Sequence, residues 1–562
     1  MKQTILAPDR DAAIVTAKGE YFGNIPDEVR DMFAAKVYHK DDASNAIGVS
    51  LVGEVFINPE YEYHPDVVQL QQLFKVMGLS PSITNVTSSE IREMYDKSDK
   101  NSSSQSSIQR DIKEYFNVAA NQSASDMHIT VKENGSFIQI RTQGDLYRFK
   151  DLTSEQGNSY CRTIYTTMCD VSDKSFTPTK SQGGRISQLY LPDKLTGVRI
   201  QTTPTENGYK MICRLLYNAK DSSNDLVSLG YEWFHQDVVE YFMSKKSGVV
   251  IVCGPTGSGK STTLEKICSR LISNTNGTQH LVTVEDPPEY EISGECSVKE
   301  PVYDEKGIIT GYVDKKVLSY AAQIPVINAK TPELKSQKFN EAISTAMRLD
   351  PDIMMIGEIR DPASASAALK AAITGHQVWT TLHANNGLTI FSRLFDIGAK
   401  RELVCDPEVV MGLIAQRLVK KICQHCAIPL VGNEDIIDSS LMNRIHDVFT
   451  KNGIGIEKIK LRNFDGCSEC NNTGIKGRTV VAEIIKCDDN FMELTREGKR
   501  VELKRYWLHE LNGITMLMHG IIKISQGLCD PRDVEAQTEH LSIPVESNKE
   551  HFTNLVNSLK DQ

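Results

Sequence analysis

The stretch GVVIVCGPTGSGKSTTLEKICSRL, residues 248–271, decides the fold of the largest part of this 562-residue chain. It joins a short apolar segment, a glycine-rich loop of the pattern G-x4-G-K-[ST] and a segment with helical periodicity. The helical segment repeats apolar residues at intervals of three and four, at Leu264, Ile267, Cys268, Leu271 and Ile272. A strand that runs through such a loop into a helix is the arrangement that binds nucleotide phosphates. The stretch therefore predicts a P-loop nucleoside-triphosphatase.

The residues of this loop have separate roles in the prediction. Backbone N–H groups of a glycine-rich loop converge on phosphate oxygens, and the helix N-terminus adds positive potential. Lys260 should reach the β- and γ-phosphates of ATP, and Ser261 should ligand Mg²⁺. The predicted ATP-binding residues are Gly254, Pro255, Thr256, Gly257, Ser258, Gly259, Lys260, Ser261 and Thr262. The alternative, a glycine-rich turn that binds no nucleotide, is disfavoured by the flanking strand and helix.

A second apolar segment, HLVTV at 280–284, leads into two acids, Glu285 and Asp286. Two prolines follow and end the strand. Open parallel sheets bind their ligands at the carboxyl ends of the strands, so one of these acids could orient or deprotonate the attacking water. The alternative is an ordinary loop acid before a proline.

A third segment, DPDIMMIGEIRD at 350–361, runs four apolar residues into Gly357 and Glu358. This pattern predicts a buried parallel strand that delivers a carboxylate to the same edge of the sheet. Most nucleotide-binding strands of this kind end in Asp. Glu358 is therefore either a catalytic or Mg²⁺-binding acid, or a surface carboxylate after a core strand.

A fourth segment, ITGHQVWTTLHANN at 373–386, ends a short apolar strand with Thr380, Thr381 and His383. Such a strand end could sense the γ-phosphate, although a single histidine is more often only hydrogen-bonded. The four segments follow one another along a pattern of short apolar strands alternating with helices, which predicts a parallel α/β sheet. We therefore expect their polar ends to meet at one edge.

Length and composition restrict the class of protein. A chain of 562 residues predicts two to four domains. The net charge of −10 argues against nucleic acid as a direct partner. No apolar run is long enough to span a bilayer, and MKQTILAPDRD lacks the apolar core of a secretory signal. Thirteen cysteines scattered among the motifs favour a reducing compartment, so we expect a cytoplasmic protein.

Composition also suggests where domains begin and end. KSDKNSSSQSS, at 97–107, cannot form a core and predicts a linker. HPDVVQLQQLFKVMG, at 64–78, predicts a helix before it. Alternating segments at 127–131, 137–142 and 197–203 predict strands. The expected parts are a docking or regulatory module at 1–97, a Ser-rich linker at 98–110, an α+β domain at 111–217, a linker at 218–232, an ATPase domain at 233–535 and a tail at 536–562.

Two C-x2-C pairs lie 40 residues apart within the ATPase domain, at Cys423, Cys426, Cys467 and Cys470. Four thiolates with this spacing favour tetrahedral Zn²⁺, and they predict a small zinc-binding subdomain at 420–475. No open coordination position is suggested, so the zinc should be structural. His425 lies inside the first pair and is not expected to be a ligand. The alternative is four unrelated core cysteines.

The sequence also resembles the secretion ATPases of type II secretion and type IV pilus assembly, over about residues 120–535. GPTGSGKST, VEDPPEY, RLDPDIMMIGEIRD and TGHQVWTTLHANN look like the Walker A, Asp box, Walker B and His box of that family, in its order. SASDMHI, GDLY, KSQGGRI and GVRIQTTPTENGYKMICRLL look like its N-terminal domain. The resemblance implies a RecA-like P-loop ATPase domain preceded by a PAS-like α+β domain, and a ring of six subunits.

The resemblance also implies roles for individual residues. The metal- and water-handling acids of the family correspond to Glu285 and Glu358, and its Walker B ends in Gly-Glu, so the missing Asp is expected there. His376 and His383 correspond to the His box. In such rings arginines of the N-terminal domain reach the nucleotide, which implies Arg199 and Arg214, and less directly Arg185.

One departure from the family lies between the Asp box and Walker B, where this chain is longer. The extra segment, around VYDEKGIITGYVDKK at 302–316, is expected to form a hairpin near the Asp box. The alignment with the family between 291 and 335 is accordingly open.

The resemblance implies a hexameric cytoplasmic motor at the inner-membrane face that drives pilin polymerisation through an inner-membrane platform protein. The N-terminal module would dock to such partners, so membrane association would be peripheral. The tetracysteine element favours assembly over retraction. The alternatives are a type II secretion ATPase that drives pseudopilus assembly, a nucleic-acid translocase on the same core, and a structural ring that binds ATP without turnover. The acidic balance and the lack of a basic-aromatic stripe disfavour the translocase.

Overall fold

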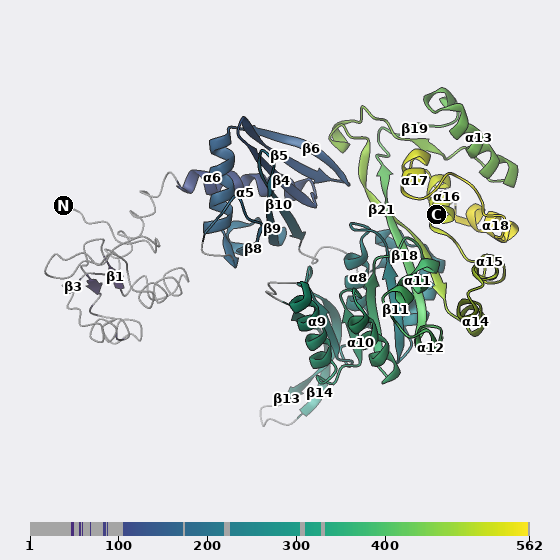
Figure 1. Cartoon of the computed structure of the whole chain (residues 1–562), viewed down its shortest axis with the longest axis horizontal. Coiled ribbons are helices and arrows are strands. Elements are labelled where there is room, and N and C mark those ends of the chain that lie inside the picture. Colours follow the sequence, from purple (N-terminus) through teal and green to yellow (C-terminus); the bar gives the residue numbers. More distant parts are fainter. Residues whose placement is uncertain are drawn as a thin grey trace. The chain divides into compact units, whose positions relative to one another are not determined.

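The computed structural model describes residues 105–171, 175–217, 225–303, 309–326 and 332–559, together with 47–49, 55–57, 83–85 and residues 59, 68 and 87. The chain forms two compact units, residues 1–118 with 153–176 and residues 119–152 with 177–562. Figure 1 shows the whole chain coloured along the sequence. The helix predicted over 64–78 lies, apart from residue 68, outside the described residues.

Among its described residues, the first unit contains a small sheet and the helices α5 (Gln105–Asn121) and α6 (Ser154–Thr167). Its strands pair in the order β1-β2-β3, with bounds Ile47–Val49, Val55–Ile57 and Ile83–Asn85. Helix α6 (Ser154–Thr167) begins with a capping box between Thr153 and Gln156, and the hydroxyl of Tyr160 donates to Asp111 at 3.0 Å. The short strand β7 (Cys169–Val171) follows.

Helix α5 (Gln105–Asn121) differs from the Ser-rich linker expected at 98–110, because it begins inside that segment. Ile112 and Phe116 are buried one turn apart, and Ile108 precedes them at the same spacing. This apolar face stabilises a helix that the serines alone would not form.

The second unit contains an antiparallel sheet in the order β6-β5-β4-β10-β9-β8. The three predicted strands are confirmed, because 127–131, 137–142 and 197–203 lie within β4, β5 and β9. Burial alternates along β10, as expected for a sheet with one covered face. The bounds are Asp126–Lys132 for β4, Gly135–Thr142 for β5, Asp145–Leu152 for β6, Gln182–Ile186 for β8, Leu195–Thr205 for β9 and Gly208–Tyr217 for β10. The predicted PAS-like character of this part stays a prediction.

The centre of the second unit is a seven-stranded sheet in the order β15-β12-β16-β17-β11-β18-β21. The first six strands in this order, β15 through β18, pair in parallel with their neighbours. Only the last strand, β21, runs antiparallel to its neighbour β18. This arrangement confirms the predicted α/β fold. The bounds are Gly248–Cys253 for β11, Leu281–Glu285 for β12, Ala322–Pro325 for β15, Ile353–Ile356 for β16, Gln377–Leu382 for β17, Val410–Ile422 for β18 and Ile475–Lys486 for β21.

Helices cover both faces of this sheet. Val249 and Ile251 of β11 pack into one apolar cluster, whereas Val250 and Val252 pack into another on the opposite face. Every residue of β11 is buried, which explains its continuous apolar sequence. Helices α7 (Trp233–Met243) and α8 (Lys260–Asn274) lie on the second face, and α9 (Pro332–Ala346), α10 (Pro362–Ile373) and α11 (Gly387–Asp396) lie on the first.

The predicted hairpin is confirmed as a two-stranded arm of β13 (Ser293–Tyr303) and β14 (Ile309–Tyr320). Figure 1 shows the arm projecting from the sheet. At its base Asn276, just beyond α8, exchanges two hydrogen bonds with the backbone of Ser297, at 2.6 and 2.7 Å. Apolar side chains such as Tyr312 and Val313 are exposed toward its tip.

The remaining helices and strands, apart from short 3-10 turns, follow β17. They are α12 (Arg401–Val404), β19 (Ile428–Pro429), α13 (Ser439–Val448), β20 (Lys460–Leu461), α14 (Asp489–Glu497), α15 (Arg500–Arg505), a π-helical turn (Tyr506–Glu510), α16 (Met516–Ser525), α17 (Pro531–Gln537) and α18 (Lys549–Leu559). Throughout the described ranges, no helix has the length and apolar character needed to cross a membrane.

Two segments expected to be a linker and a tail are packed instead. Leu226 and Tyr231, within the linker expected at 218–232, are buried in the apolar cluster around α8. Helix α18, within the tail expected at 536–562, buries Phe552, Val556 and Leu559. Both segments carry apolar side chains that find partners only in the folded domain.

Candidate nucleotide and metal sites

The glycine-rich loop joins the carboxyl end of β11 to the first turn of α8. Gly254 has φ +153°, and a Cβ there would lie 2.4 Å from the carbonyl oxygen of Gln416. Gly259 has φ +87° immediately before the helix. No larger residue fits the first position, and the second favours glycine because its backbone is left-handed. The loop therefore follows the path that turns backbone N–H groups toward an anion.

Lys260 lies at the start of α8, and its ammonium group is held over the loop. Its Nζ donates to the carbonyl oxygens of Gly254 at 2.8 Å and Pro255 at 3.2 Å. Burial lowers the pKa of Lys260, and the charge of Glu358 acts in the opposite direction. Ser261 follows on the exposed side, and the hydroxyl of Thr262 contacts that of Tyr290 at 3.2 Å.

Sequence reasoning missed a buried support under this loop. Gln416 of β18 is fully buried, and its Nε2 donates to the carbonyl oxygen of Ser258 at 2.8 Å. The hydroxyl of Tyr231 donates to the Oε1 of Gln416 at 2.7 Å. Nothing in the local sequence marks either residue, because the contacts span 158 and 185 positions of the chain.

Glu285 is the last residue of β12, and its carboxylate is held by two side chains. Thr283 donates to its Oε1 at 2.7 Å, and Gln323 of β15 donates to the same oxygen at 2.9 Å. Burial raises the pKa of Glu285, while these two hydrogen bonds lower it in part.

Glu358 lies two residues beyond β16 and contacts two basic side chains. Arg360 donates to its Oε2 at 2.7 Å, and the Nε2 of His383 lies 3.2 Å from its Oε1. The hydroxyl of Thr381, in β17, donates to the carbonyl oxygen of Gly357 at 2.7 Å and fixes the backbone before the acid. Glu358 is therefore held by neighbouring side chains rather than projecting freely into solvent.

Lys260, Glu285, Glu358 and His383 follow four adjacent parallel strands of one sheet, β11, β12, β16 and β17. Their meeting at one edge is therefore a consequence of strand order. Asp286 lies there too, where its Oδ2 pairs with Lys335 at 2.7 Å and with Arg360 at 3.0 Å. Their catalytic roles stay predictions.

The other predicted residues lie in different settings. His376 precedes β17, at the amino end of the strand, where its Nδ1 contacts the carbonyl oxygen of Ala371 at 2.9 Å. It therefore does not join His383, which follows the same strand. The Nη2 of Arg199 donates to the backbone oxygen of Asp286 at 3.1 Å. Arg214 instead pairs through its Nε with the buried Asp126 at 3.1 Å.

A pocket of about 330 Å³ opens beside the loop. It is lined by Pro255 of the loop, by His383 to Asn385, and by the Thr389, Ser392, Arg393 and Asp396 side of α11. The His383 end of β17 thus faces accessible volume next to the predicted phosphate site.

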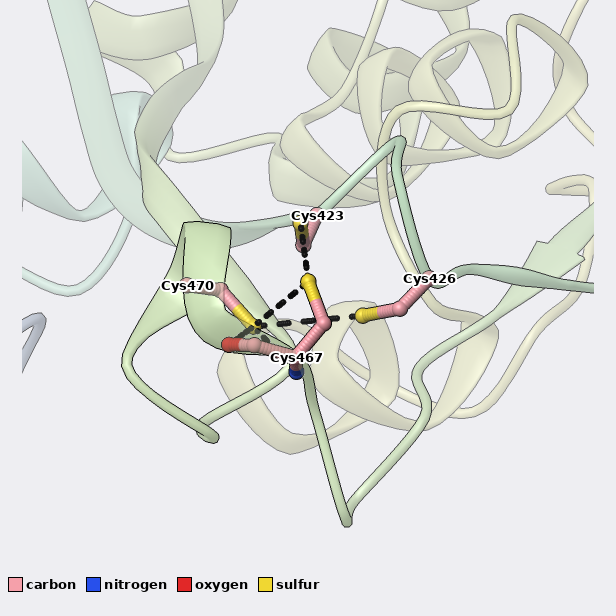
Figure 2. A group of neighbouring side chains, drawn as sticks. All are labelled: Cys423, Cys426, Cys467 and Cys470. Carbon is pink, nitrogen blue, oxygen red and sulfur yellow. Dashed lines mark hydrogen bonds between the residues drawn. The ribbon is translucent and has the colours of Figure 1, made fainter.

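The four predicted cysteine ligands come together at one point. Figure 2 shows the four side chains pointing toward one another from two chain segments. Their sulfur atoms all lie within 4.8 Å of one another, with Cys423 to Cys467 and Cys426 to Cys470 at 3.9 Å and Cys467 to Cys470 at 3.8 Å. A tetrahedron with Zn–S bonds of about 2.3 Å has edges of about 3.8 Å, so the group fits one such ion.

The surroundings of Cys470 favour a thiolate. Backbone N–H groups of Cys467 and Gly474 each donate to its sulfur at 3.1 Å. Burial raises the pKa of the Cys470 thiol, but hydrogen bonds from the backbone of Cys467, Gly474 and Thr473 and from the Cys467 thiol outweigh it and bring the pKa to about 6. The four sulfurs could therefore hold a metal ion, and N–H donors of this kind orient metal-bound thiolates.

The strand–loop–helix unit lies at the carboxyl ends of the parallel strands, and two acids lie at neighbouring strand ends. This arrangement defines the class of P-loop nucleotide-binding proteins. Within that class, the chain belongs to the family described as Type II/IV secretion system protein, whose profile matches residues 101–536. The predicted family is thereby confirmed.

Named relatives come from two kinds of system. The type II secretion system protein HxcR of Pseudomonas aeruginosa is 29% identical over 68% of this chain and 66% of its own length. The type IV pilus assembly ATPase PilB of Thermus thermophilus is 28% identical over 77% of this chain and 43% of its own. The type II secretion system ATPase E of Vibrio cholerae is 30% identical over 67% of this chain and 64% of its own. The chain thus spans less than two thirds of the length of these relatives.

Among solved structures, the ATPase DotB of Legionella pneumophila matches 74% of this chain and 92% of its own with 19% identity and a TM-score of 0.47. A TM-score below 0.5 adds nothing to what the sheet order of the chain itself shows about the fold.

Proposed function

We propose that this chain is an ATP-hydrolysing motor that powers type IV pilus assembly. The observation that carries the proposal is the set of polar groups at one sheet edge: Lys260, Glu285, Glu358 and His383 after four adjacent strands. Membership in a family whose named relatives include a pilus assembly ATPase supports the motor function.

In this proposal the loop residues Gly254 to Thr262 bind the phosphates of ATP. Lys260, which contacts the carbonyl oxygens of Gly254 and Pro255, would bind the β- and γ-phosphates, and the hydroxyl of Ser261 would ligand Mg²⁺. When bound, Mg²⁺ neutralises charge that develops on the phosphate oxygens. Arg199 and Arg214 belong to the N-terminal domain. We assign them to stabilise the phosphoryl group during its transfer.

The two acids differ in their surroundings, and we assign them different roles. Arg360 and His383 contact Glu358 and hold both of its carboxylate oxygens at the end of its strand, an arrangement that suits a ligand in the Mg²⁺ shell. Glu285 is half-buried, and desolvation raises its pKa, which suits acceptance of a proton from the attacking water. Glu285 is therefore the proposed general base.

The proposed assembly is a homohexamer in the cytoplasm, peripheral to the inner membrane. Residues 1–97 would dock to an inner-membrane platform protein, and rotation of the N-terminal domain against the ATPase domain would drive pilin polymerisation. Zn²⁺ held by the four cysteines would stabilise the subdomain at 420–475. No direct contact with nucleic acid is proposed.

A type II secretion ATPase that drives a pseudopilus is the second candidate. It is favoured by relatives with those names. A host strain that lacks this chain separates the two. Loss of surface pili with normal export of folded exoproteins supports pilus assembly, and the reverse supports type II secretion.

Hydrolysis itself is tested with the full chain and MgATP. Glu358→Gln should lower kcat by about 100-fold or more while ATP binding persists, because the amide cannot replace a metal-shell carboxylate. Unchanged hydrolysis would contradict the assignment of Glu358. A wild-type chain that binds ATP and does not hydrolyse it would instead favour the structural ring. Strong stimulation by DNA that is lost with salt would instead support a translocase.

A further inference from the structure

Gln323 belongs to none of the sequence motifs, yet its side chain is bonded to the acid at the end of β12. Its Nε2 donates to the Oε1 of Glu285 at 2.9 Å and to the carbonyl oxygen of Tyr290 at 2.9 Å. Its own Oε1 accepts from the backbone N–H of Ile292 at 3.1 Å. The side-chain amide of Gln323 thus forms hydrogen bonds with three polar groups.

The register of the sheet puts this amide in place. Strand β15 pairs in parallel with β12, and Gln323 lies directly beside Thr283. Thr283 and Glu285 point to the same side of β12, because side chains alternate along a strand. Two donors on adjacent strands therefore converge on one oxygen of Glu285.

The orientation of the amide is decided by its partners. A backbone N–H of Ile292 needs an acceptor, so the amide oxygen must face it. The amide nitrogen is then directed at two acceptors, a carboxylate and a carbonyl. A flipped amide would place like groups against each other at every contact.

We propose that Gln323 is a positioning residue for Glu285, orienting its carboxylate to take the proton of the attacking water. The inference rests on the proposed role of Glu285 as general base. Gln323 does not touch the reacting atoms itself. It acts by holding one carboxylate oxygen, which restricts the rotation of the group and stabilises its charged form.

The same amide links the two chain segments at the base of the arm through its hydrogen bonds to the backbone of Tyr290 and Ile292. Tyr290 and Ile292 lead into β13, and β15 resumes the sheet after β14. The carboxylate of Glu285 and the two chain segments that bracket the arm are therefore held by one side chain, which no local sequence pattern marks.

The pH dependence of hydrolysis distinguishes positioning from general stability. Gln323 donates to the charged form of Glu285, so its loss should raise the pKa of that carboxyl group further. The other titratable groups facing Glu285 are Glu289 in the next loop and the thiol of Cys268 on α8. The charge of Glu289 raises the pKa of Glu285, whereas its backbone hydrogen bond lowers that pKa and is unchanged in the variants. The thiol of Cys268 is buried, which raises its own pKa and keeps it neutral near pH 7. Neither group supplies a new donor when Gln323 is lost.

The experiment measures kcat and KM for MgATP across pH in the full chain, for the wild type, Gln323→Leu and the isosteric Gln323→Glu. We expect the acid limb of kcat to move up by about one pH unit in Gln323→Leu, and further in Gln323→Glu, with KM changed less than about twofold. Gln337→Leu removes an exposed glutamine amide of α9 and is the matched control, with no expected shift.

The outcomes distinguish the positioning role of Gln323 from the general-base role of Glu285. If both Gln323 variants keep the wild-type limb and kcat while Glu285→Gln is inactive, the positioning role is overturned and the base assignment stands. If Glu285→Gln hydrolyses ATP like the wild type, the base assignment fails, and the positioning role fails with it. Because Gln323→Glu keeps the shape of the side chain, it tests the inference even if Gln323→Leu does not fold.

Discussion

Arg360 forms a close ion pair with Glu358, in which its Nε donates to the Oε2 of the carboxylate at 2.7 Å. The same guanidinium reaches the Oδ2 of Asp286 from Nη1 at 3.0 Å. One cation therefore lies between two acids that follow adjacent strands. Without it the two carboxylates would repel each other.

Replacement of Arg360 by Gln should impair hydrolysis more than folding. Glu358 loses the group that orients it, so we expect kcat to fall about 10-fold and the Mg²⁺ concentration for half-maximal rate to rise. The pair is partly exposed, so its contribution to stability is small. A Mg²⁺ titration of ATP hydrolysis and a thermal melt measure the two effects.

Arg505→Gln is the matched control, because Arg505 is an exposed residue of α15. Its kinetics should match the wild type. An Arg360→Gln variant with wild-type kcat and Mg²⁺ dependence would show that the ion pair does not orient Glu358.

Loss of the Tyr231 hydroxyl should weaken nucleotide binding. Tyr231→Phe leaves the buried Oε1 of Gln416 without its donor, and Gln416 supports the carbonyl of Ser258 in the loop. An unsatisfied buried acceptor costs about 1–3 kcal/mol, part of which should appear as a KM for ATP raised about three- to tenfold. Steady-state kinetics and isothermal titration calorimetry with ATP test this.

Tyr312→Phe removes a hydroxyl from an exposed position on the arm and should leave KM unchanged. If Tyr231→Phe binds ATP as tightly as the wild type, the support under the loop does not contribute to affinity.

Stability should fall as pH rises from about 4.5 to about 7 because of Glu483. This residue of β21 is buried and accepts from the backbone N–H groups of Gly387 at 2.6 Å and Met516 at 3.4 Å. Burial raises the pKa of Glu483 from the ordinary 4.5 to about 7. The folded state therefore holds a proton that the unfolded state releases, and the stabilisation present below pH 4.5 is lost as pH approaches 7.

The difference in pKa corresponds to about 3 kcal/mol between the two ends of this window. Glu483→Gln cannot titrate, so its free energy of unfolding should lack this decline. Urea unfolding at pH 5 and pH 8 measures it, with the exposed Glu550→Gln of α18 as the control. Equal pH dependence in the wild type and Glu483→Gln would contradict the prediction.

The tetracysteine group should hold one zinc ion per chain. We expect Cys467→Ser to lose most of the metal and to unfold at a lower temperature, because three thiolates bind Zn²⁺ less tightly than four. Elemental analysis of the purified chain and a thermal melt with and without a chelator measure both. Cys213→Ser, in β10, should keep the metal content of the wild type. A wild-type chain without metal, with a melting temperature insensitive to chelators, would overturn the zinc assignment.

Local patterns predicted much of the fold and of the candidate site. The P-loop unit at 248–271, the strands at 127–131, 137–142 and 197–203 and the hairpin at 302–316 agree with the structure. Each depends on periodicity, turn residues or backbone freedom within a few positions of the chain. The cysteine spacing likewise predicted that four ligands lie together. Each C-x2-C pair brings two thiols close by itself, so only one contact between the two pairs is needed to bring all four together.

Contacts between distant segments were not predictable in this way. Gln323 meets Glu285 across 38 positions because β15 happens to be the edge strand beside β12. The expected tail folded as α18, since its apolar face is useful only where the domain offers a partner surface.

The sequence by itself therefore determined which groups stand at the strand ends, namely the phosphate loop, the two glutamates and His383, and which four cysteines come together. Only the tertiary structure decided what holds them, namely Arg360 on Glu358, Gln323 on Glu285 and Gln416 under the loop. The physical reason is that chemistry at a strand end is encoded next to that strand. The order of strands in a sheet, by contrast, is set by packing over the whole domain.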